Sequence, residues 1–477
     1  MIMQVLIRVI LFLLIFSVAA SGSDIREKEE TGASIEKHKA ELIRLSDQIW
    51  TFAETALREH RSSEALATYA EQQGLKVERG VAGMPTAFVA SYGQGRPIIG
   101  ILGEFDALPG ISQKATTVKE ALEEGAAGHG CGHNLFGTAS LGAAVAIKEL
   151  LAAGKLKGTI RFYGTPAEES VSGKVYMARA GLFKDLDVCL AWHPDSETKA
   201  DVQSTQAIID FIVEFKGKAA HAAFDPWNGR SAVDGLEAFT QGINMLREHV
   251  RPSVRMHYTI VKAGDVPNVV PEYAKVWCWV RDSKLTGVDV VLQRVREIAQ
   301  GAAQIAGVES KFTIQTGCYE MLVNLAGAKL LQQNLTWLGP IKYTDQEQQF
   351  ARAIQRATGT DQKGLDGEIK PLEVPRPDPP GGSTDVADVS WIVPTLHLSV
   401  TTAPQSVWHA WPVVSCAGMS IGHKGMVHAA KTLAATMVDL FEDTKVREAI
   451  QAEFKEKTRG FVYKPYIPEG PPPIPKN

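Results

Sequence analysis

The chain has 477 residues, of which 45% are hydrophobic, and its formal net charge at pH 7 is -4. This length supports two or three folded domains with hydrophobic cores. The charges are interspersed and form no basic stripe, which argues against a nucleic-acid-binding protein.

The N-terminal residues differ from the rest of the chain. Arg8 precedes an apolar run at 9–16, and small residues follow at 17–23. A charged start, a short apolar centre and a small-residue end are typical of a secretory signal peptide, which we place at residues 1–22. We therefore expect an exported, periplasmic protein with no membrane segment after cleavage. A retained N-terminal anchor is the alternative.

The next part of the chain alternates predicted helices and strands. Residues 35–60 have the apolar spacing of an amphipathic helix, and residues 134–152 form a second, strongly helical segment. Short apolar runs at 98–102, 159–163 and 188–191 are typical of buried strands. This alternation predicts an α/β fold with a mixed, mostly parallel sheet flanked by helices, beginning at residues 35–203.

The pattern changes at about residue 204. Strand and helix signals then follow in the order β-α-β-β-α-β, which is that of a ferredoxin-like α+β unit. We therefore predict a separate domain at 204–319, inserted into the first. The predicted segments are 208–215, 231–250, 256–262, 274–281, 288–306 and 311–316.

The first domain is expected to resume at 320–445. It would contain a proline- and glycine-rich loop at 371–382, followed by strand and helix signals at 391–399 and 426–441. Residues 446–477 are predicted to form a proline-rich C-terminal tail, which is extended from Arg459 onward.

Residues with metal-binding and acid–base chemistry follow the predicted strands. Cys131 and His133 lie in a glycine-rich run just before the helix at 134–152. Asp106, the Glu168–Glu169 pair and His193 come just after strands. In a parallel sheet such positions meet at one edge, so we predict a divalent metal site there. The motifs are Gly-Glu-Phe-Asp at 103–106, Pro-Ala-Glu-Glu at 166–169 and Trp-His-Pro at 192–194.

The five cysteines form no Cys-x-x-Cys pair. Their odd number argues against a dense disulfide framework, although one or two bridges remain open.

These motifs resemble those of the M20 metallopeptidase clan, and in particular its amidohydrolase branch. The resemblance extends over about residues 36–465. It rests on 106–109 (Asp-Ala-Leu-Pro), 129–133 (His-Gly-Cys-Gly-His), 166–169 (Pro-Ala-Glu-Glu), 219–223 (Ala-Ala-His-Ala-Ala), 267–271 (Pro-Asn-Val-Val-Pro) and 382–385 (Gly-Ser-Thr-Asp).

The resemblance assigns roles to individual residues. It implies two divalent ions, manganese or zinc, with Glu168 as the general base. Asp106 would orient the metal ligands without binding a metal itself. For the last ligand, His409, His423 and His428 compete, and the family position favours His409. The implied metal ligands are Cys131, His133, Glu169, His193 and His409.

The same resemblance implies contributions from the inserted domain. His221 would reach the active site of a partner subunit and stabilise an oxyanion, and Asn268 would bind substrate. The domain would thus mediate a homodimer, and a second type of subunit is possible.

The implied reaction is cleavage of the amide bond of aminobenzoyl-glutamate or another N-acyl amino acid. One alternative is a dipeptidase or carboxypeptidase of the same clan. Another, from a different class, is a periplasmic metal- or ligand-binding protein without catalysis. The spare carboxylate of Glu168 favours an enzyme over a binding protein.

Overall fold

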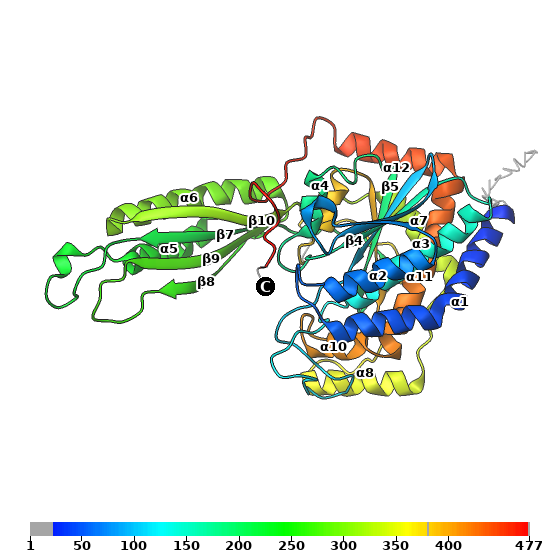
Figure 1. The fold of residues 1–477 in the computed structure, drawn as a ribbon, viewed down its shortest axis with the longest axis horizontal. Coiled ribbons are helices and arrows are strands. Elements are labelled where there is room, and N and C mark those ends of the chain that lie inside the picture. The colour runs from blue at the N-terminus through cyan, green and yellow to red at the C-terminus, as the bar shows by residue number, and fades with distance from the viewer. Residues whose placement is uncertain (1–21, 379–380, 476–477) are drawn as a thin grey trace, which may run out of the picture.

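The computed structural model describes residues 22–378 and 381–475. It contains a larger unit around a seven-stranded sheet and a smaller unit that projects to one side of it (Figure 1). The predicted signal peptide at 1–22 lies outside the described residues except for Gly22, which begins the first helix.

The larger sheet has the strand order β1-β2-β4-β3-β5-β11-β6. Its four central strands β4, β3, β5 and β11 are parallel, while β1, β2 and β6 join at the edges in antiparallel orientation. This confirms the predicted mixed sheet, although the edge strands were not predicted. The strands are β1 (Lys76–Arg79), β2 (Phe88–Gln94), β3 (Ile98–Glu104), β4 (Gly158–Thr165), β5 (Val188–Asp195), β6 (Lys199–Ala200) and β11 (Thr395–Thr401).

Helices flank this sheet, and the central one is α3 (His133–Ala152). It is long and apolar enough to cross a membrane, but it is mostly buried between α1, α11 and the sheet. Its glycines permit this packing, since a Cβ atom on Gly142 would lie 2.8 Å from Leu42 of α1. The other helices are α1 (Gly22–Phe52), α2 (His60–Gln72), η1 (Val81–Gly83), α4 (Gly173–Arg179), α7 (Leu325–Leu338), α8 (Asp345–Thr358), α9 (Val386–Ser390), α10 (Trp411–Ala417), α11 (Ser420–Glu442) and α12 (Thr444–Lys457).

Two predicted segments differ in the structure. The helix predicted at 35–60 ends at Phe52, because Ala53 and Leu57 adopt positive φ angles of 43° and 60° and turn the chain into α2. The segment predicted as a proline-rich tail at 446–477 begins as helix α12. Its prolines start only at Pro465, so nothing in the first part of the segment prevents a helix.

The smaller unit has the order β7-α5-β8-β9-α6-β10, and its antiparallel sheet has the strand order β10-β7-β9-β8. Both helices pack on one face of that sheet and bury Ile209, Phe211 and Val276. This confirms the predicted ferredoxin-like unit. Its elements are β7 (Ala207–Lys216), η2 (Pro226–Asn228), α5 (Ala232–Leu246), η3 (Arg247–His249), β8 (Arg255–Ala263), β9 (Tyr273–Asp282), α6 (Leu285–Ala306) and β10 (Glu309–Cys318).

The C-terminal tail, which we define as residues 461–475, crosses from one unit to the other (Figure 1). The Tyr466 hydroxyl hydrogen-bonds the Asp289 carboxylate of α6 at 2.9 Å. Four residues later, the Gly470 carbonyl accepts a hydrogen bond of 2.6 Å from Arg179 of α4. The tail therefore contacts both units near their junction.

Candidate metal centre and adjoining cavity

The structure brings all five predicted ligands together at the carboxyl edge of the central strands. Cys131 Sγ lies 3.3 Å from His193 Nε2, and Glu169 Oε2 lies 3.8 Å from His409 Nε2. Ligand atoms of Cys131, His133 and His193 lie within 4.8 Å of one another, as do those of Cys131, Glu169 and His409. Cys131 belongs to both groups and links them.

Unpaired buried atoms in these groups fit a bound cation. Glu169 Oε1 is buried and has no hydrogen-bond partner among the described residues, and His133 Nε2 is buried with only the Glu104 carboxylate, at 3.0 Å, beside it. Such atoms are costly in a folded protein unless another partner satisfies them. A donor set of sulfur, imidazole nitrogen and carboxylate oxygen suits zinc, and its carboxylates also tolerate manganese.

Cys131 would bind such a cation as a thiolate. All five cysteines are buried and unpaired, so no disulfide forms among them. Burial raises the pKa of the Cys131 thiol, and the nearby Glu169 carboxylate raises it further. A coordinated cation reverses this effect because it deprotonates the thiol that binds it.

Asp106 orients two of the predicted ligands. Its Oδ1 atom accepts a 2.9 Å hydrogen bond from His133 Nδ1, and its Oδ2 atom accepts one of 2.9 Å from the Glu169 backbone N–H. His133 Nε2 therefore points away from Asp106 and lies 3.0 Å from Glu104 Oε2. Metal-binding histidines commonly have a carboxylate partner of this kind on their second nitrogen.

The adjacent glutamates Glu168 and Glu169 belong to different groups. Glu168 lies with Glu104 and His133, whose ligand atoms are within 4.8 Å of one another, whereas Glu169 lies with Cys131. Ala167, with φ 63°, turns the chain just before the pair. Burial, and then the carboxylates of Glu104 and Glu169, raise the pKa of Glu168 well above its ordinary value. Such a carboxyl group keeps its proton to a higher pH than an exposed glutamate does.

A buried lysine, which sequence reasoning missed, neutralises part of this negative charge. Lys174 Nζ lies 2.6 Å from Glu104 Oε1 and 2.6 Å from Asp385 Oδ1, and all three side chains are buried. The sequence offered only a weak signal, since Asp385 ends the Gly-Ser-Thr-Asp motif and Glu104 ends an apolar strand.

Among the three competing histidines, His409 is at the site. His423 Nε2 bonds Asp47 at 2.8 Å, and His428 Nε2 bonds the Gly339 carbonyl at 2.9 Å, so both are engaged elsewhere. His409 adopts a φ of 56°, in the left-handed region. Strained backbone of this kind is frequent at functional sites.

His221 and Asn268 do not line this site. They lie in the loops that join β7 to α5 and β8 to β9, at the end of the smaller unit farthest from the larger one (Figure 1). The two loops pair, because the Ala222 N–H donates to the Asn268 carbonyl at 3.0 Å. His221 Nδ1 accepts from the Ala223 N–H at 3.2 Å, so its proton is on Nε2.

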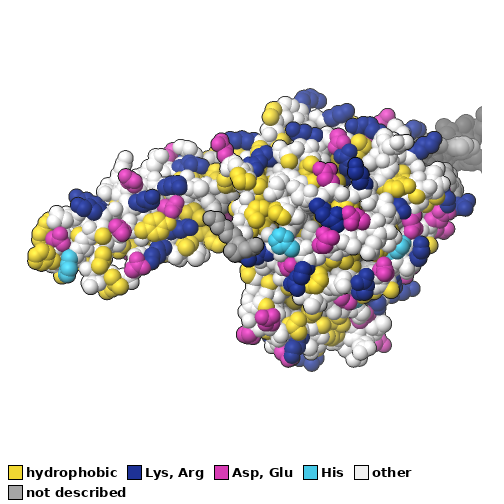
Figure 2. All heavy atoms as spheres, viewed as in Figure 1, with side chains coloured by type: hydrophobic (Ala, Val, Ile, Leu, Met, Phe, Trp, Pro, Cys, Tyr) yellow, Lys and Arg dark blue, Asp and Glu magenta, His cyan; other side chains and the backbone are white. Residues whose placement is uncertain are grey.

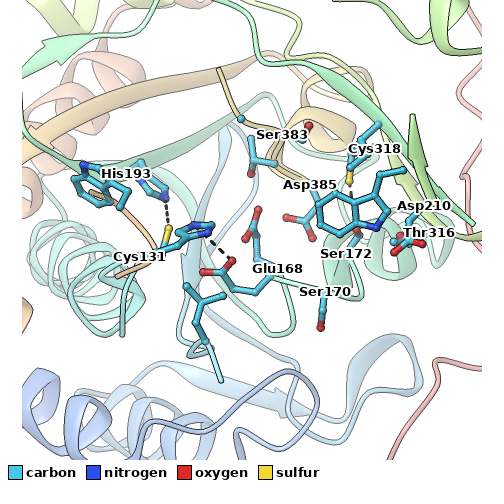
Figure 3. A pocket seen from close by; sticks show the side chains of 18 of the residues that line it. Cys131, Glu168, Ser170, Ser172, His193, Asp210, Thr316, Cys318, Ser383 and Asp385 are labelled. Carbon is cyan, nitrogen blue, oxygen red and sulfur yellow. Dashed lines mark hydrogen bonds and ion pairs between the residues drawn. The ribbon is translucent and has the colours of Figure 1, made fainter. Parts of the chain in front are cut away.

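A cavity of about 560 Å³ joins the metal-ligand cluster to the smaller unit. Figure 3 shows Cys131 and His193 toward one end, Glu168 and Asp385 in the middle, and Asp210 and Thr316 at the other end. The lining therefore comes from both units. It includes Leu108, Cys131, Glu168, Glu169, Ser170, Ser172, His193, Pro194, Asp195, Ile208, Asp210, Trp279, Arg281, Thr316, Cys318, Gly382, Ser383, Thr384, Asp385, Trp408 and His409.

Similar proteins place this architecture in a family. The Peptidase dimerisation domain of the M20 family matches residues 204–305. The chain is 38% identical to one of the subunits of the p-aminobenzoyl-glutamate hydrolase of Escherichia coli, over 93% of this chain and 98% of the relative. The chain belongs to the M20 family. This membership confirms the predicted reaction class, a metal-dependent hydrolase of amide bonds.

Two further M20 relatives extend the comparison. The human Xaa-Arg dipeptidase is 28% identical over 90% of this chain and 92% of its own length. A dinuclear metal binding peptidase of Bacillus subtilis has the same fold. Its solved structure has a TM-score of 0.58 and 18% identity, and the match covers 85% of this chain and 99% of the peptidase.

Proposed function

We propose that this M20 protein cleaves the amide bond of p-aminobenzoyl-glutamate or a closely related N-acyl amino acid. The extensive similarity to the E. coli hydrolase supports the substrate class. The observation that supports the reaction is the position of Glu168. Its carboxyl group is not part of either metal-ligand group that contains Cys131, yet it lies beside His133.

In this proposal Cys131, His133, Glu169, His193 and His409 hold two divalent ions, zinc or manganese. The bound ions would polarise the amide carbonyl and make a water molecule more acidic. Glu168 accepts the proton that this water loses and returns it to the departing amine. The raised pKa of Glu168 supports this role, because the group must both bind and release a proton.

The far end of the smaller unit supports a homodimer. It carries exposed hydrophobic side chains, which Figure 2 shows gathered on its tip. Phe224 is 79% exposed and Trp227 is 71% exposed, and both follow His221 closely in the chain. Exposed apolar clusters of this kind are typical of interaction sites. We infer that this tip, with His221 and Asn268, completes the active site of a second copy. A second type of subunit is a further possibility for the assembly.

The N-terminal signal pattern, which lies outside the described residues, supports export to the periplasm. Detection of the mature N-terminus after residue 22 in an exported fraction would test this inference.

Hydrolysis of p-aminobenzoyl-glutamate by the purified protein tests the function directly. We expect turnover that a chelator abolishes and that added zinc or manganese restores. Glu168→Gln should keep its metal content but lose at least ~10²-fold in kcat, because it removes a proton acceptor. Full turnover after metal removal, or an unchanged rate for Glu168→Gln, would contradict the proposed chemistry. Glu64→Gln, an exposed carboxylate on α2, serves as the control.

Dipeptides with a C-terminal arginine belong in the same assay. The similarity to the Xaa-Arg dipeptidase favours them as the second candidate substrates. Hydrolysis of these dipeptides without hydrolysis of p-aminobenzoyl-glutamate would identify the chain as a dipeptidase.

A further inference from the structure

The end of the cavity opposite the metal-ligand cluster is formed by the open face of the smaller sheet. In the strand register, Asp210 of β7 is opposite Trp279 of β9 and Thr316 of β10. Because side chains alternate along a strand, Asp210 points away from the face that α5 and α6 cover, where its neighbours Ile209 and Phe211 are buried. Asp210, Trp279 and Thr316 therefore form one row across the cavity wall.

Asp210 is a buried carboxylate with spare hydrogen-bonding capacity. Only 4% of the residue is exposed, and it forms no ion pair with a Lys or Arg of the described chain. The Trp277 indole N–H donates to its Oδ1 atom at 2.5 Å, and the Trp279 indole interacts with it as well. Two indoles leave about half of the four lone-pair positions of a carboxylate without a donor.

Electrostatics favour an uncharged or cationic donor beside Asp210. Burial raises the pKa of Asp210 to about 6, against the effect of the two indole N–H groups. The group is therefore ionised at neutral pH, and it would repel a substrate carboxylate. Arg281, which lies on the same face of β9, donates to Ser383 Oγ at 3.1 Å, and its guanidinium lies over the Trp279 ring, 5.0 Å from the centroid, rather than pairing with Asp210.

The surroundings of Asp210 are suited to a flat apolar group. Ile208 and Cys318 form an apolar cluster with Val175, and Trp279 and Ile467 of the C-terminal tail pack against it. An indole face and aliphatic carbons on adjacent positions accommodate an aromatic ring well. Figure 3 shows Asp210 at one end of the cavity and Glu168 toward the middle, so a ring bound here would lie between these two carboxyl groups.

We propose that this end of the cavity is the aroyl subsite, in which Trp279 and Ile208 contact the ring of the substrate and Asp210 accepts a hydrogen bond from an amine at the para position. The inference rests on the proposed function, since it assigns the aroyl half of that substrate. Asp210 acts here as a specificity residue. A substrate without the amine leaves the buried carboxylate without its donor, and sites of this type discriminate strongly against such analogues.

The test compares p-aminobenzoyl-glutamate with benzoyl-glutamate, which lacks only the amine. Both kcat/KM and the dissociation constant from calorimetry are measured for the metal-loaded wild-type protein, for Asp210→Asn and for Asp210→Ala. We expect the wild type to prefer the amine-bearing compound at least ~10-fold, and both variants to lose most of that preference. Glu214→Gln is the matched control, because Glu214 is on the same strand and face but bonds Tyr273 outside the cavity.

Three results would overturn the subsite. One is an unchanged preference in both Asp210 variants. Another is an equal loss for both compounds, which would indicate a structural role. The third is tighter binding of both compounds to Asp210→Asn, which would mean that a substrate carboxylate lies there. If the compounds bind with the Asp210-dependent preference but are not hydrolysed, the subsite stands and the proposed function fails. If neither compound binds, both fail.

Discussion

At the scale of single residues, the candidate site depends on how buried carboxyl groups are paired. Glu104 and Asp385 share the ammonium group of Lys174, while Asp106 is held by His133 and the Glu169 backbone. Burying a charge without such partners is costly. The pairing keeps several acidic groups together at one edge of the sheet.

Asp388 on α9 provides a pH-dependent test of this burial. It accepts hydrogen bonds from the Tyr463 hydroxyl at 2.8 Å and the Tyr319 N–H at 3.1 Å. Burial raises its pKa from 3.8 to about 8 despite these bonds. The folded chain therefore binds one more proton than the unfolded chain between these values, so its stability should fall as pH rises through this range.

Thermal unfolding of wild type and Asp388→Asn between pH 4.5 and 8.5 checks this expectation. The variant has no titrating group at position 388, so its Tm should rise relative to that of the wild type as pH increases. Asp361→Asn, at an exposed position, should run parallel to wild type. If the Tm of Asp388→Asn also changes with pH in parallel with that of the wild type, the raised pKa of Asp388 is contradicted.

The residues predicted from sequence are those in short motifs of distinctive composition. Cys131 and His133 are separated by one residue, and Glu168 and Glu169 are adjacent, so their chemistry was visible locally. Lys174 and Asp210 could not be found this way. Lys174 bonds an aspartate 211 positions away, and Asp210 acquires its surroundings from β9 and β10. Pairing over such distances is set by the fold.

At the scale of elements, helix α3 positions part of the metal-ligand cluster. His133 begins this helix, and Gly137 lies one turn later against β3. A Cβ atom on Gly137 would be 2.6 Å from the Glu104 carbonyl oxygen, which is backbone and cannot easily move. The absence of a side chain at this position lets the helix lie close to the strand.

Gly137→Ala should therefore separate α3 from β3. We expect a loss of about 1–3 kcal/mol in unfolding free energy, as for other overpacked sites, together with weaker metal binding measured by chelator competition. Gly32→Ala is the control, because this glycine in α1 has nothing within 4 Å of the added carbon. That change should be neutral or stabilise by up to ~1 kcal/mol. Equal effects of the two substitutions would rule out the proposed contact.

The amphipathic helices α5 and α6 were predictable from their periodicity, and α3 was predictable from its long run of helix-favouring apolar residues. The edge strands were not, because β1 is only four residues long and mostly exposed. The turn after α1 was also hidden, since its residues favour a helix. There the Glu54 carboxylate accepts hydrogen bonds from the Arg61 and Ser62 N–H groups, and the Glu54 carbonyl bonds the distant Ala107 N–H. These contacts stabilise the first turn of α2. They outweigh the intrinsic helix propensity of the residues in the turn.

At the scale of the whole molecule, the C-terminal tail connects the two units beside the cavity. It bonds Asp289 of the smaller unit and Arg179 of the larger one, and Ile467 packs against the cluster around Ile208. A chain shortened after Arg459 should thus have a more mobile smaller unit. We expect faster hydrogen exchange in β10 and a several-fold higher KM, with unchanged metal content.

Val462→Ser is a suitable control for the truncation, since Val462 is 84% exposed in the same tail. It should behave as wild type in both measurements. Exchange rates and KM that do not change on truncation would show that the tail does not restrain the junction.

The path of the tail has a consequence for biosynthesis. Residues 461–475 are translated after both sheets, yet Ile467 packs against Ile208 and Cys318, which line the aroyl end of the cavity. The ribosome must release this stretch before that packing can form. A nascent chain held just short of it would therefore contain both folded sheets but an unfinished pocket.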